Sequence, residues 1–237
     1  MDLNSKIEDA ARFFWSTRAR QSSKQKASGV TDAGARSAVT GGKQLEGFEK
    51  LTIDIALRSG IEEKSIYQGT SLELPGYFRP TKKWDLLIID EGALVAAIEF
   101  KSQVGPSFGN NFNNRLEEAV GTATDLWTAY REGAFTDSPK PWLGYFFVLE
   151  DCEKSRIPVK VSEPHFNVFP EFKNASYSDR YILLQQKLVR ERLYDASSLI
   201  LTKRDPFTVA SSKKEISAKR FFSQFQGHLK AYLDEKS

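Results

Sequence analysis

The residues best suited to chemistry lie between Lys83 and Lys101, in the stretch KWDLLIIDEGALVAAIEFK. This stretch contains Asp85 and, after an apolar interval, Glu99 and Lys101 with one residue between them. Hard cations such as Mg²⁺ take carboxylate and carbonyl oxygens, so Asp85, Glu99 and the Phe100 carbonyl can form half of a coordination shell. Lys101 would then orient or help deprotonate an attacking water and offset charge on a pentavalent phosphate. This set of groups is suited to phosphodiester hydrolysis.

A β-hairpin is expected to position these groups. Two apolar runs, over residues 86–89 and 93–98, flank an Asp-Glu-Gly turn signal, which predicts two antiparallel strands joined by a short loop. If the loop is centred on this turn signal, Asp85 falls opposite residues 97–99. Its carboxylate would then lie beside Glu99 across the ladder.

Alternation along the second strand assigns the side chains to faces. With a period of two, Glu99 and Lys101 share a face with Val95, while Ile98 and Phe100 point the other way into packing. The same pattern of Asp, gap and Glu-x-Lys also occurs by chance as an exposed edge strand with a salt bridge. The apolar run after the Asp favours the catalytic interpretation, because unpaired charges are costly in such a setting.

Specific sequence strings flank the hairpin on both sides. LPGYFRPTK occupies residues 74–82, and GPSFGNNFNNR occupies residues 105–115. Further strings are GGK at 41–43 with EGF at 46–48, EDCEKS at 150–155, PHF at 164–166 and FP at 169–170. Together with the Asp and Glu-x-Lys set, they closely resemble the XhoI family of type II restriction endonucleases, within the PD-(D/E)xK nuclease superfamily, over roughly residues 30–185. Trp84 stands where the broader class often has Pro, a residue that shapes the turn and supplies no ligand.

This resemblance implies an Mg²⁺-dependent endonuclease that cuts double-stranded DNA at CTCGAG and leaves 5′ overhangs. It also implies a companion adenine methyltransferase that protects host DNA. The resemblance assigns catalytic roles to Asp85, Glu99 and Lys101. It assigns metal ligation to Asp85, Glu99 and the carbonyl of Phe100. The residues expected at the DNA are Lys43, Arg79, Lys82, Asn110, Asn111, Asn113, Asn114 and Arg115. Asn suits adenine edges and Arg suits guanine, although the Asn-rich segment is equally consistent with turn formers and a helix cap.

An acidic residue from the preceding helix is expected near the metal. Apolar periodicity predicts a helix over residues 44–59 that stops at Gly60. Glu46 and Glu49 flank its apolar face. The family string of two glycines, a basic residue and an acid before Gly-Phe favours Glu46 as the fourth catalytic residue, and Glu49 is expected to be solvated.

Length and composition suit one endonuclease domain spanning residues 1–237. The chain is 40% hydrophobic and 27% charged, and its net charge of +3 permits DNA binding without requiring it. A single cysteine, Cys152, excludes an internal disulfide and fits a reducing prokaryotic cytoplasm. No signal segment is expected, and no apolar run approaches the ~20 residues that a membrane span needs.

The N-terminal quarter of the chain predicts a helix and then a basic segment. A capping box formed by Ser5 and Glu8 opens an amphipathic first helix. Residues 21–43 are expected to be mobile, either as a solvated linker or as a basic arm that orders along phosphates. Their basic residues are Lys24, Lys26, Arg36 and Lys43.

The remaining elements predict an α/β fold with a restriction-endonuclease-like core, in which helices flank a mixed central sheet. A helix over 114–130, capped by Asn113 or Asn114, and a strand over 142–149 complete a βαβ crossover. Residues 150–175 read as an irregular excursion, and its His165 is expected to pack or to face DNA because no nucleophile triad can be assembled around it. A helix over 177–193, a strand near 197–202 and a last helix opened by a capping box at Ser212 and Glu215 follow.

The chain contains one Asp and Glu-x-Lys set, which cuts one strand, and the implied target is palindromic. Together these two features predict a homodimer. The candidate interfaces are the first helix around Phe14 and Trp15 and the last helix around Phe221 and Phe225, whose apolar stripe is alternatively core. Two other functions remain open at this stage. One is a repair or junction-resolving nuclease on the same core, and the other is a DNA-binding module without catalysis.

Overall fold

The computed structural model describes residues 2–27, 42–136 and 138–236, with the side chains of 24–27 left aside. A six-stranded sheet in the order β1-β4-β5-β6-β7-β8 forms its centre. The pairs β5–β6 and β6–β7 are parallel and the other three pairs are antiparallel, so the sheet is mixed. Its strands are β1 (Ile66–Gln68), β4 (Leu86–Asp90), β5 (Ala93–Gln103), β6 (Trp142–Glu150), β7 (Ala196–Lys203) and β8 (Thr208–Ser211).

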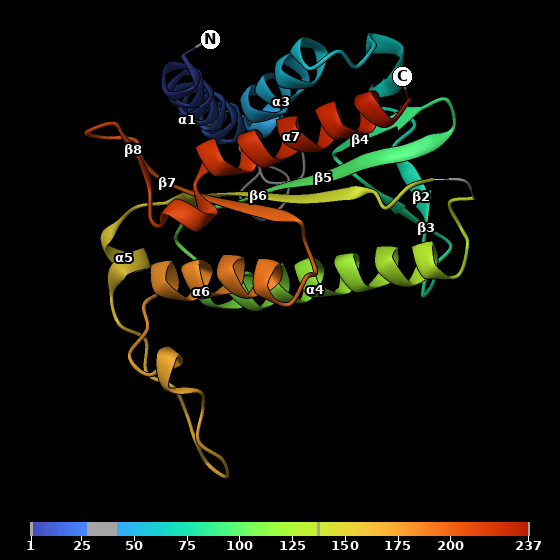
Figure 1. The fold of residues 1–237 in the computed structure, drawn as a ribbon. Helices are drawn as coiled ribbons and strands as arrows, with labels where there is room; N and C mark the ends of the chain where they lie inside the picture. Colours follow the sequence, from blue (N-terminus) through green and yellow to red (C-terminus); the bar gives the residue numbers. More distant parts are fainter. Residues whose placement is uncertain (1, 28–41, 137, 237) are drawn as a thin grey trace.

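Helices cover both faces of this sheet (Figure 1). On one face lie α1 (Leu3–Ala27), α3 (Glu46–Arg58) and α7 (Ala218–Lys236), and on the other lie α4 (Gly109–Arg131) and α6 (Tyr177–Arg190). The helix α4 connects the parallel strands β5 and β6, and α6 connects β6 and β7, because parallel neighbours need a long crossover. The predicted α/β class with a mixed sheet flanked by helices is confirmed.

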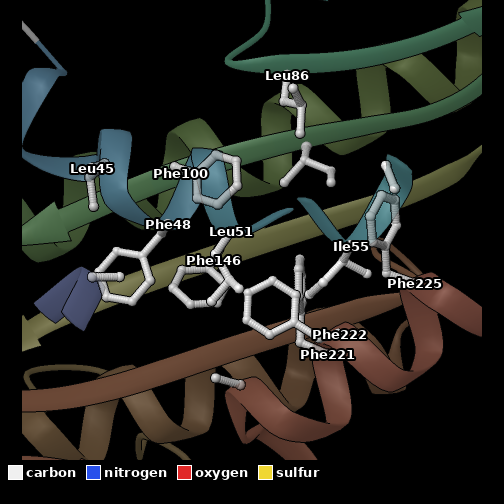
Figure 2. Packing of buried hydrophobic residues seen from close by; sticks show 14 of the residues in the cluster. Leu45, Phe48, Leu51, Ile55, Leu86, Phe100, Phe146, Phe221, Phe222 and Phe225 are labelled. Atoms are coloured by element: carbon white, nitrogen blue, oxygen red, sulfur yellow. The ribbon is translucent and has the colours of Figure 1, made fainter. Parts of the chain in front are cut away.

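An aromatic cluster joins the first face to the sheet. Phe146 of β6 lies at its centre, with ring centroids 5.0 Å from Phe48, 5.6 Å from Phe100, 5.3 Å from Phe221 and 5.6 Å from Phe222. Figure 2 shows these rings meeting between α3, α7 and the sheet. This packing holds α3, which carries Glu46 and Glu49, over the strand that carries Glu99.

The β4–β5 hairpin confirms the predicted turn and register. Glu91 and Gly92 have φ values of 50° and 88°, the positive values of a type I′ turn. Leu86 pairs with Ile98. Because the two strands are antiparallel, one step further along the ladder places Asp85 opposite Glu99. The prediction that Asp85 lies opposite residues 97–99 therefore holds.

A β-bulge corrects the prediction that Val95 shares the face of Glu99. The ladder pairs Ile88 with Ala96 but Ile89 with Leu94, so Val95 is the extra residue on β5. The bulge restarts the alternation, and Val95 packs in the same cluster as Ile98.

Three helix starts differ from the predicted caps. Asp2 rather than Ser5 caps α1, since its carboxylate accepts the Asn4 N–H at 3.1 Å. The helix α4 begins at Gly109, and its N-cap is Phe108, so Asn113 and Asn114 are not caps. The helix α7 begins at Ala218, and the Ser217 hydroxyl accepts the Arg220 N–H at 3.2 Å. Ser212 precedes the short 3-10 helix η4 (Lys214–Ile216), and Glu215 lies within it. At α1 and α7 a nearby polar side chain replaces the cap expected from spacing, whereas the N-cap of α4 makes no side-chain hydrogen bond.

The basic segment predicted over residues 21–43 lies largely outside the described residues, since 28–41 with Arg36 are not among them. Its first part, residues 21–27, continues α1 as helix. Its last two residues precede α3, and Lys43 opens the short 3-10 helix η1 (Lys43–Leu45).

The predicted excursion after β6 projects from the molecule. Apart from α5 (Glu153–Arg156) and η3 (Pro170–Phe172), residues 151–175 are irregular, and residues 157–175, here called the arm, extend away from the helices (Figure 1). A bridge between Pro158 and Ser176 closes its base. Within the arm Phe166 is 89% exposed, Phe169 is 70% exposed, and His165 is exposed rather than packed.

The two helices predicted as subunit interfaces contribute those residues to the core instead. Phe14, Phe221 and Phe225 are fully buried within the single chain, and Trp15 is nearly so. These four side chains cannot meet a second copy without unfolding their own core. No helix in the described part of the chain is long and apolar enough to cross a membrane.

Candidate active site

Asp85, Glu99 and Lys101 meet where the hairpin ends. The Asp85 Oδ2 atom accepts the Phe100 backbone N–H at 2.8 Å and the Lys101 ammonium at 3.2 Å. The same ammonium pairs with Glu99 Oε2. The Lys101 side chain therefore bridges the two carboxylates, and the predicted trio is one cluster.

Lys82 joins this cluster, which the sequence did not indicate. It lies on β3 (Thr81–Lys83), which pairs with β2 (Glu73–Pro75) in a separate hairpin. Its ammonium contacts Glu99 Oε1, so each oxygen of Glu99 faces a different lysine. The sequence assigned Lys82 to DNA alone, because separation along the chain hides a contact made between two hairpins.

The cluster's electrostatics explain how buried charges are tolerated. The Glu99 side chain is only 3% exposed, and burial would raise its pKa, but Lys101 and Lys82 outweigh burial and hold that pKa below its ordinary value. Burial and the Glu99 charge raise the pKa of Asp85. Burial opposes protonation of Lys101, yet Glu99 and Asp85 raise its pKa well above the ordinary value. In this arrangement Lys101 is an ammonium that supplies charge and orientation rather than a general base.

The donor set of the cluster fits a hard divalent cation. Asp85 and Glu99 supply two carboxylates, whose charges the Lys101 and Lys82 ammoniums compensate here and a dication can compensate in their place. The Phe100 N–H points toward Asp85, and in a strand the carbonyl of the same residue faces the same side. No group of three or more His, Cys, Asp or Glu side chains arranged for a metal occurs among residues 2–27, 42–136 and 138–236. A metal here would rely on two carboxylates, a carbonyl and water or phosphate oxygens.

The acidic residues of α3 line a pocket of about 590 Å³ on one side of Asp85. Glu49 is half-buried, accepts the Gln68 amide at 2.6 Å, and has its pKa raised to about 7, chiefly by burial and also by Asp85 and Glu46. The expectation that Glu49 is a solvated surface residue is therefore wrong. Glu46 lines the same pocket, and whether either carboxylate contacts a metal stays a prediction.

We predict that Glu49 makes folding stability depend on pH. Because its folded pKa of about 7 lies above the ordinary 4.5, its protonated form stabilises the fold, and that contribution is lost as pH rises from about 4.5 through about 7. Urea unfolding without metal, at about pH 5 and about pH 7.5, should show a steeper loss of stability for the wild type than for Glu49→Gln. Equal slopes for the two proteins would contradict the assignment, and Asp54→Asn, on an exposed part of α3, is the matched control.

A second pocket of about 450 Å³ lies on the α4 side of the cluster. Four cations line it, Arg79, Lys82, Lys101 and Arg115, against three acids, Glu99, Glu117 and Glu118. This small excess of positive charge beside the cluster favours an anionic substrate.

Tyr145 also lines this pocket and was missed by the sequence. It is the β6 partner of Glu99 in the ladder, it is 1% exposed, and its hydroxyl has no hydrogen-bond partner among the described residues. Burial raises its pKa, so it remains a hydroxyl able to donate to a water or substrate oxygen. The position of Tyr145 in the predicted strand over residues 142–149 could have indicated it. The strand was treated as a uniform apolar run, so its one hydroxyl was not considered.

The Asn-rich segment is helical and divides into two groups. Asn110, Asn113 and Asn114 are exposed and, at spacings of three and four, share one face of the first turns of α4. Asn111 donates to the Ser107 carbonyl at 2.6 Å, which is a structural role. Arg115 faces the pocket of Glu99, whereas Asn110 lines a different pocket with Phe108 and Tyr177.

The other two predicted DNA contacts lie at the rims of the two pockets. Lys43 is exposed and lines the Glu49 pocket. Arg79 lines the Glu99 pocket, and its Nε donates to Asp125 at 2.6 Å. Each of the two cations therefore lines one of the two pockets that flank the cluster.

Comparison with known proteins decides the family. The model described as restriction endonuclease XhoI matches residues 24–213, most of the chain. The chain belongs to this family. Among relatives, the type II restriction enzyme BstVI of Geobacillus stearothermophilus is 54% identical over 176 residues, 72% of this chain and 79% of that one.

Two further relatives carry the same kind of name. The type II restriction enzyme XhoI of Xanthomonas vasicola is 52% identical over 161 residues, 67% of this chain and 65% of the relative. The type II restriction enzyme AbrI of Azospirillum brasilense is 51% identical over 166 residues, 70% of this chain and 74% of the relative. No solved structure matches.

Membership of the XhoI family confirms the resemblance read from the sequence strings. The chain is by class a type II restriction endonuclease, a site-specific deoxyribonuclease whose substrate is DNA. Enzymes of this type generally require a divalent metal, in agreement with the donor set around Asp85 and Glu99. The match extends to residue 213, beyond the expected limit near 185, and leaves α7 outside.

Proposed function

We propose that this enzyme hydrolyses both strands of duplex DNA at the palindrome CTCGAG, uses Mg²⁺, and leaves 5′ overhangs. The observation that carries the proposal is the cluster in which Lys101 bridges Asp85 and Glu99. The identity of more than half of the matched residues to the XhoI of Xanthomonas vasicola supports a shared target.

In the proposed reaction Asp85, Glu99 and the Phe100 carbonyl would hold Mg²⁺. Bound there, the ion would supply Lewis acidity and lower the pKa of water. Lys101 holds its ammonium beside the cluster, orients the attacking water and offsets the charge that develops on the phosphate. Lys82 neutralises the other oxygen of Glu99 and presents positive charge to the pocket where the DNA backbone enters.

Digestion of a plasmid of known sequence tests the target and the metal together. With Mg²⁺, discrete fragments that end at CTCGAG are expected, and end-sequencing should show 5′ overhangs; with EDTA no cleavage is expected. Plasmid methylated at the site by a companion adenine methyltransferase should resist cutting. Structure-dependent nicking would instead indicate a repair or junction nuclease, and binding without cutting would indicate a DNA-binding module.

Base readout is proposed for the exposed face of α4 formed by Asn110, Asn113 and Asn114, together with Arg115. Asn forms bidentate pairs with adenine and Arg with guanine, each worth ~1–3 kcal/mol of discrimination. We expect Asn113→Ala and Asn114→Ala to cut single-base variants of the site better relative to CTCGAG than the wild type does. Asn111→Ala is the control, because its amide is occupied by Ser107. Uniform loss on all sequences, without relaxed specificity, would leave these residues with a structural role.

A homodimer is proposed because one cluster cuts one strand and the target presents the same half-site twice. The arm offers a surface for a second copy. Its Phe166 and Phe169 are exposed, while Glu163 pairs with Lys173 at 3.2 Å and Glu171 pairs with Lys187 at 2.8 Å. Apolar rings among already paired charges suit a protein surface better than phosphate.

Sedimentation of the protein on a CTCGAG duplex in Ca²⁺ tests this arrangement. Two 26.8 kDa chains per duplex are expected for the wild type, and the Phe166→Ala/Phe169→Ala double variant should shift toward one. Leu57→Ala, at an exposed position of α3, is the control. One wild-type chain per intact site would refute the dimer, and an unchanged double variant would refute the arm as its interface.

A further inference from the structure

Two aromatic side chains stand exposed at the tip of the β2–β3 hairpin, which joins residues 75 and 81. Tyr77 is 54% exposed and Phe78 is 70% exposed, and their rings meet edge to face at 4.9 Å and 84°. Large aromatic rings in water forgo burial energy, and two of them together at one tip form an apolar surface that is usually functional.

A buried carboxylate fixes the backbone of this tip. Asp125 of α4 is 3% exposed, and its Oδ1 accepts the backbone N–H groups of Tyr77 and Phe78, each at 2.8 Å, while its Oδ2 accepts Arg79 Nε at 2.6 Å. Gly76 is required for this fit, because a Cβ there would lie 2.6 Å from Asp125 Oδ2 and 2.7 Å from the Arg79 carbonyl. The backbone that carries the two rings is therefore held in one geometry, so binding a ligand there costs little backbone entropy.

The tip is attached directly to the catalytic cluster. Beyond the tip, β3 carries Lys82, whose ammonium contacts Glu99, and four residues after Thr81 the chain reaches Asp85. Phe78 itself lies seven residues before Asp85, so at about 3.3 Å per residue at most ~23 Å of chain, or about seven base-pair rises, separates the ring-bearing residue from the cluster. Arg79 and Lys82 line the same pocket as Glu99 and Lys101.

The charges beside the rings select the kind of ligand. Residues 73–83 carry three cations, Arg79, Lys82 and Lys83, against one acid, Glu73. Aromatic rings among cations suit a ligand that combines negative charge with apolar faces, which in this enzyme is DNA. Two of these cations are paired within the chain, Arg79 with Asp125 and Lys82 with Glu99, but residues 73–83 keep an excess of positive charge. The arm has no such excess, because its two cations, Lys160 and Lys173, are balanced by Glu163 and Glu171.

We propose that Tyr77 and Phe78 form a rigid wedge that inserts against a base step beside the scissile phosphate and unstacks it. The proposal rests on the proposed cleavage of duplex DNA. Side chains that insert in this way kink the duplex, and the wedge thereby brings the backbone toward Lys82 and the cluster. The wedge supplies affinity and shape selection at positions that no hydrogen bond reads.

The test uses the full chain in Ca²⁺ on a duplex in which 2-aminopurine replaces the adenine of CTCGAG, with dyes at the two ends. The wild type should raise 2-aminopurine fluorescence and shorten the end-to-end distance. Tyr77→Ala and Phe78→Ala should lose most of both signals and bind about 5- to 150-fold more weakly, the range for loss of one base–aromatic contact. The slope of affinity against salt should stay unchanged, since no phosphate contact is removed. Leu57→Ala is the control for an exposed apolar side chain remote from the hairpin.

The outcomes separate the wedge from the cleavage function. Wild-type cutting of the unlabelled duplex in Mg²⁺ is measured on the same preparation. If the wild type cuts but the Tyr77→Ala/Phe78→Ala double variant binds within twofold of it and keeps both optical signals, the wedge is overturned and the function stands. If the wild type neither binds nor cuts the duplex, the proposed function fails and takes the wedge with it.

Discussion

Replacement of Lys101 by alanine is expected to slow cleavage of a CTCGAG duplex by at least ~10²–10³-fold while specific binding persists. The ammonium bridges Asp85 and Glu99 at the point where charge develops during hydrolysis, so its loss removes stabilisation of the transition state rather than of the bound substrate. Single-turnover cleavage in Mg²⁺ measures the rate, and fluorescence anisotropy in Ca²⁺ measures the binding. Asp85→Ala and Glu99→Ala should give losses of the same order.

Lys64→Ala provides the matched control for this prediction. Lys64 is an exposed lysine that pairs with Glu62, so its loss removes one positive charge without touching the cluster. Cleavage by the control should stay close to that of the wild type. A Lys101→Ala enzyme that cuts within about tenfold of the wild type, a change of only ~1.4 kcal/mol in the barrier, would rule out the catalytic assignment.

Replacement of Phe146 by alanine is expected to cost about 3–5 kcal/mol of unfolding free energy. The ring is fully buried and lies within 5.6 Å, centroid to centroid, of four other aromatic rings. These rings come from α3, β5 and α7 and meet around Phe146 (Figure 2). Its removal leaves a cavity that three elements cannot close without moving together. For a chain of this size the midpoint of thermal unfolding should fall by roughly 6–20 °C.

Phe78→Ala makes the same chemical change on the surface and is the control for the core. Because Phe78 is 70% exposed, its loss should change stability by no more than about 0.5 kcal/mol. Urea unfolding of both variants in the absence of DNA measures the difference. Equal destabilisation by the two changes would show that the aromatic cluster does not hold α3 and α7 on the sheet.

Several features of this protein are decided by local sequence. The Asp-Glu-Gly turn between two apolar runs set the β4–β5 hairpin and brought Asp85 opposite the Glu-x-Lys segment, because strand register follows from turn position and period two. The long helical period after β5 and the apolar run over residues 142–149 likewise predicted the parallel β5–α4–β6 crossover. The strings around the hairpin identified the family, since identical short motifs in order rarely recur by chance.

Some local signals were ambiguous and misled. Ser5 with Glu8 and Ser212 with Glu215 match capping boxes, yet Asp2 and Ser217 cap those helices. Several polar residues near a helix start can serve as caps, and the chain's path into the core selects among them. The apolar stripes of α1 and α7 were ambiguous for a similar reason. An apolar helix face does not show whether it packs on its own sheet or on another subunit.

Only the tertiary structure determined the rest of the site. Lys82 reaches Glu99 from another hairpin, Asp125 on α4 fixes the tip of that hairpin, and Tyr145 lies beside Glu99 across a parallel pair. Each contact joins residues more than 15 positions apart, where spacing carries no information about proximity. The raised pKa of Glu49 also depends on burial under neighbouring elements. The sequence by itself determined that Asp85 and the Glu-x-Lys segment come together at the end of one hairpin. Packing between distant segments decided which charges, hydroxyls and exposed rings surround them, because burial and electrostatic coupling are properties of the assembled fold.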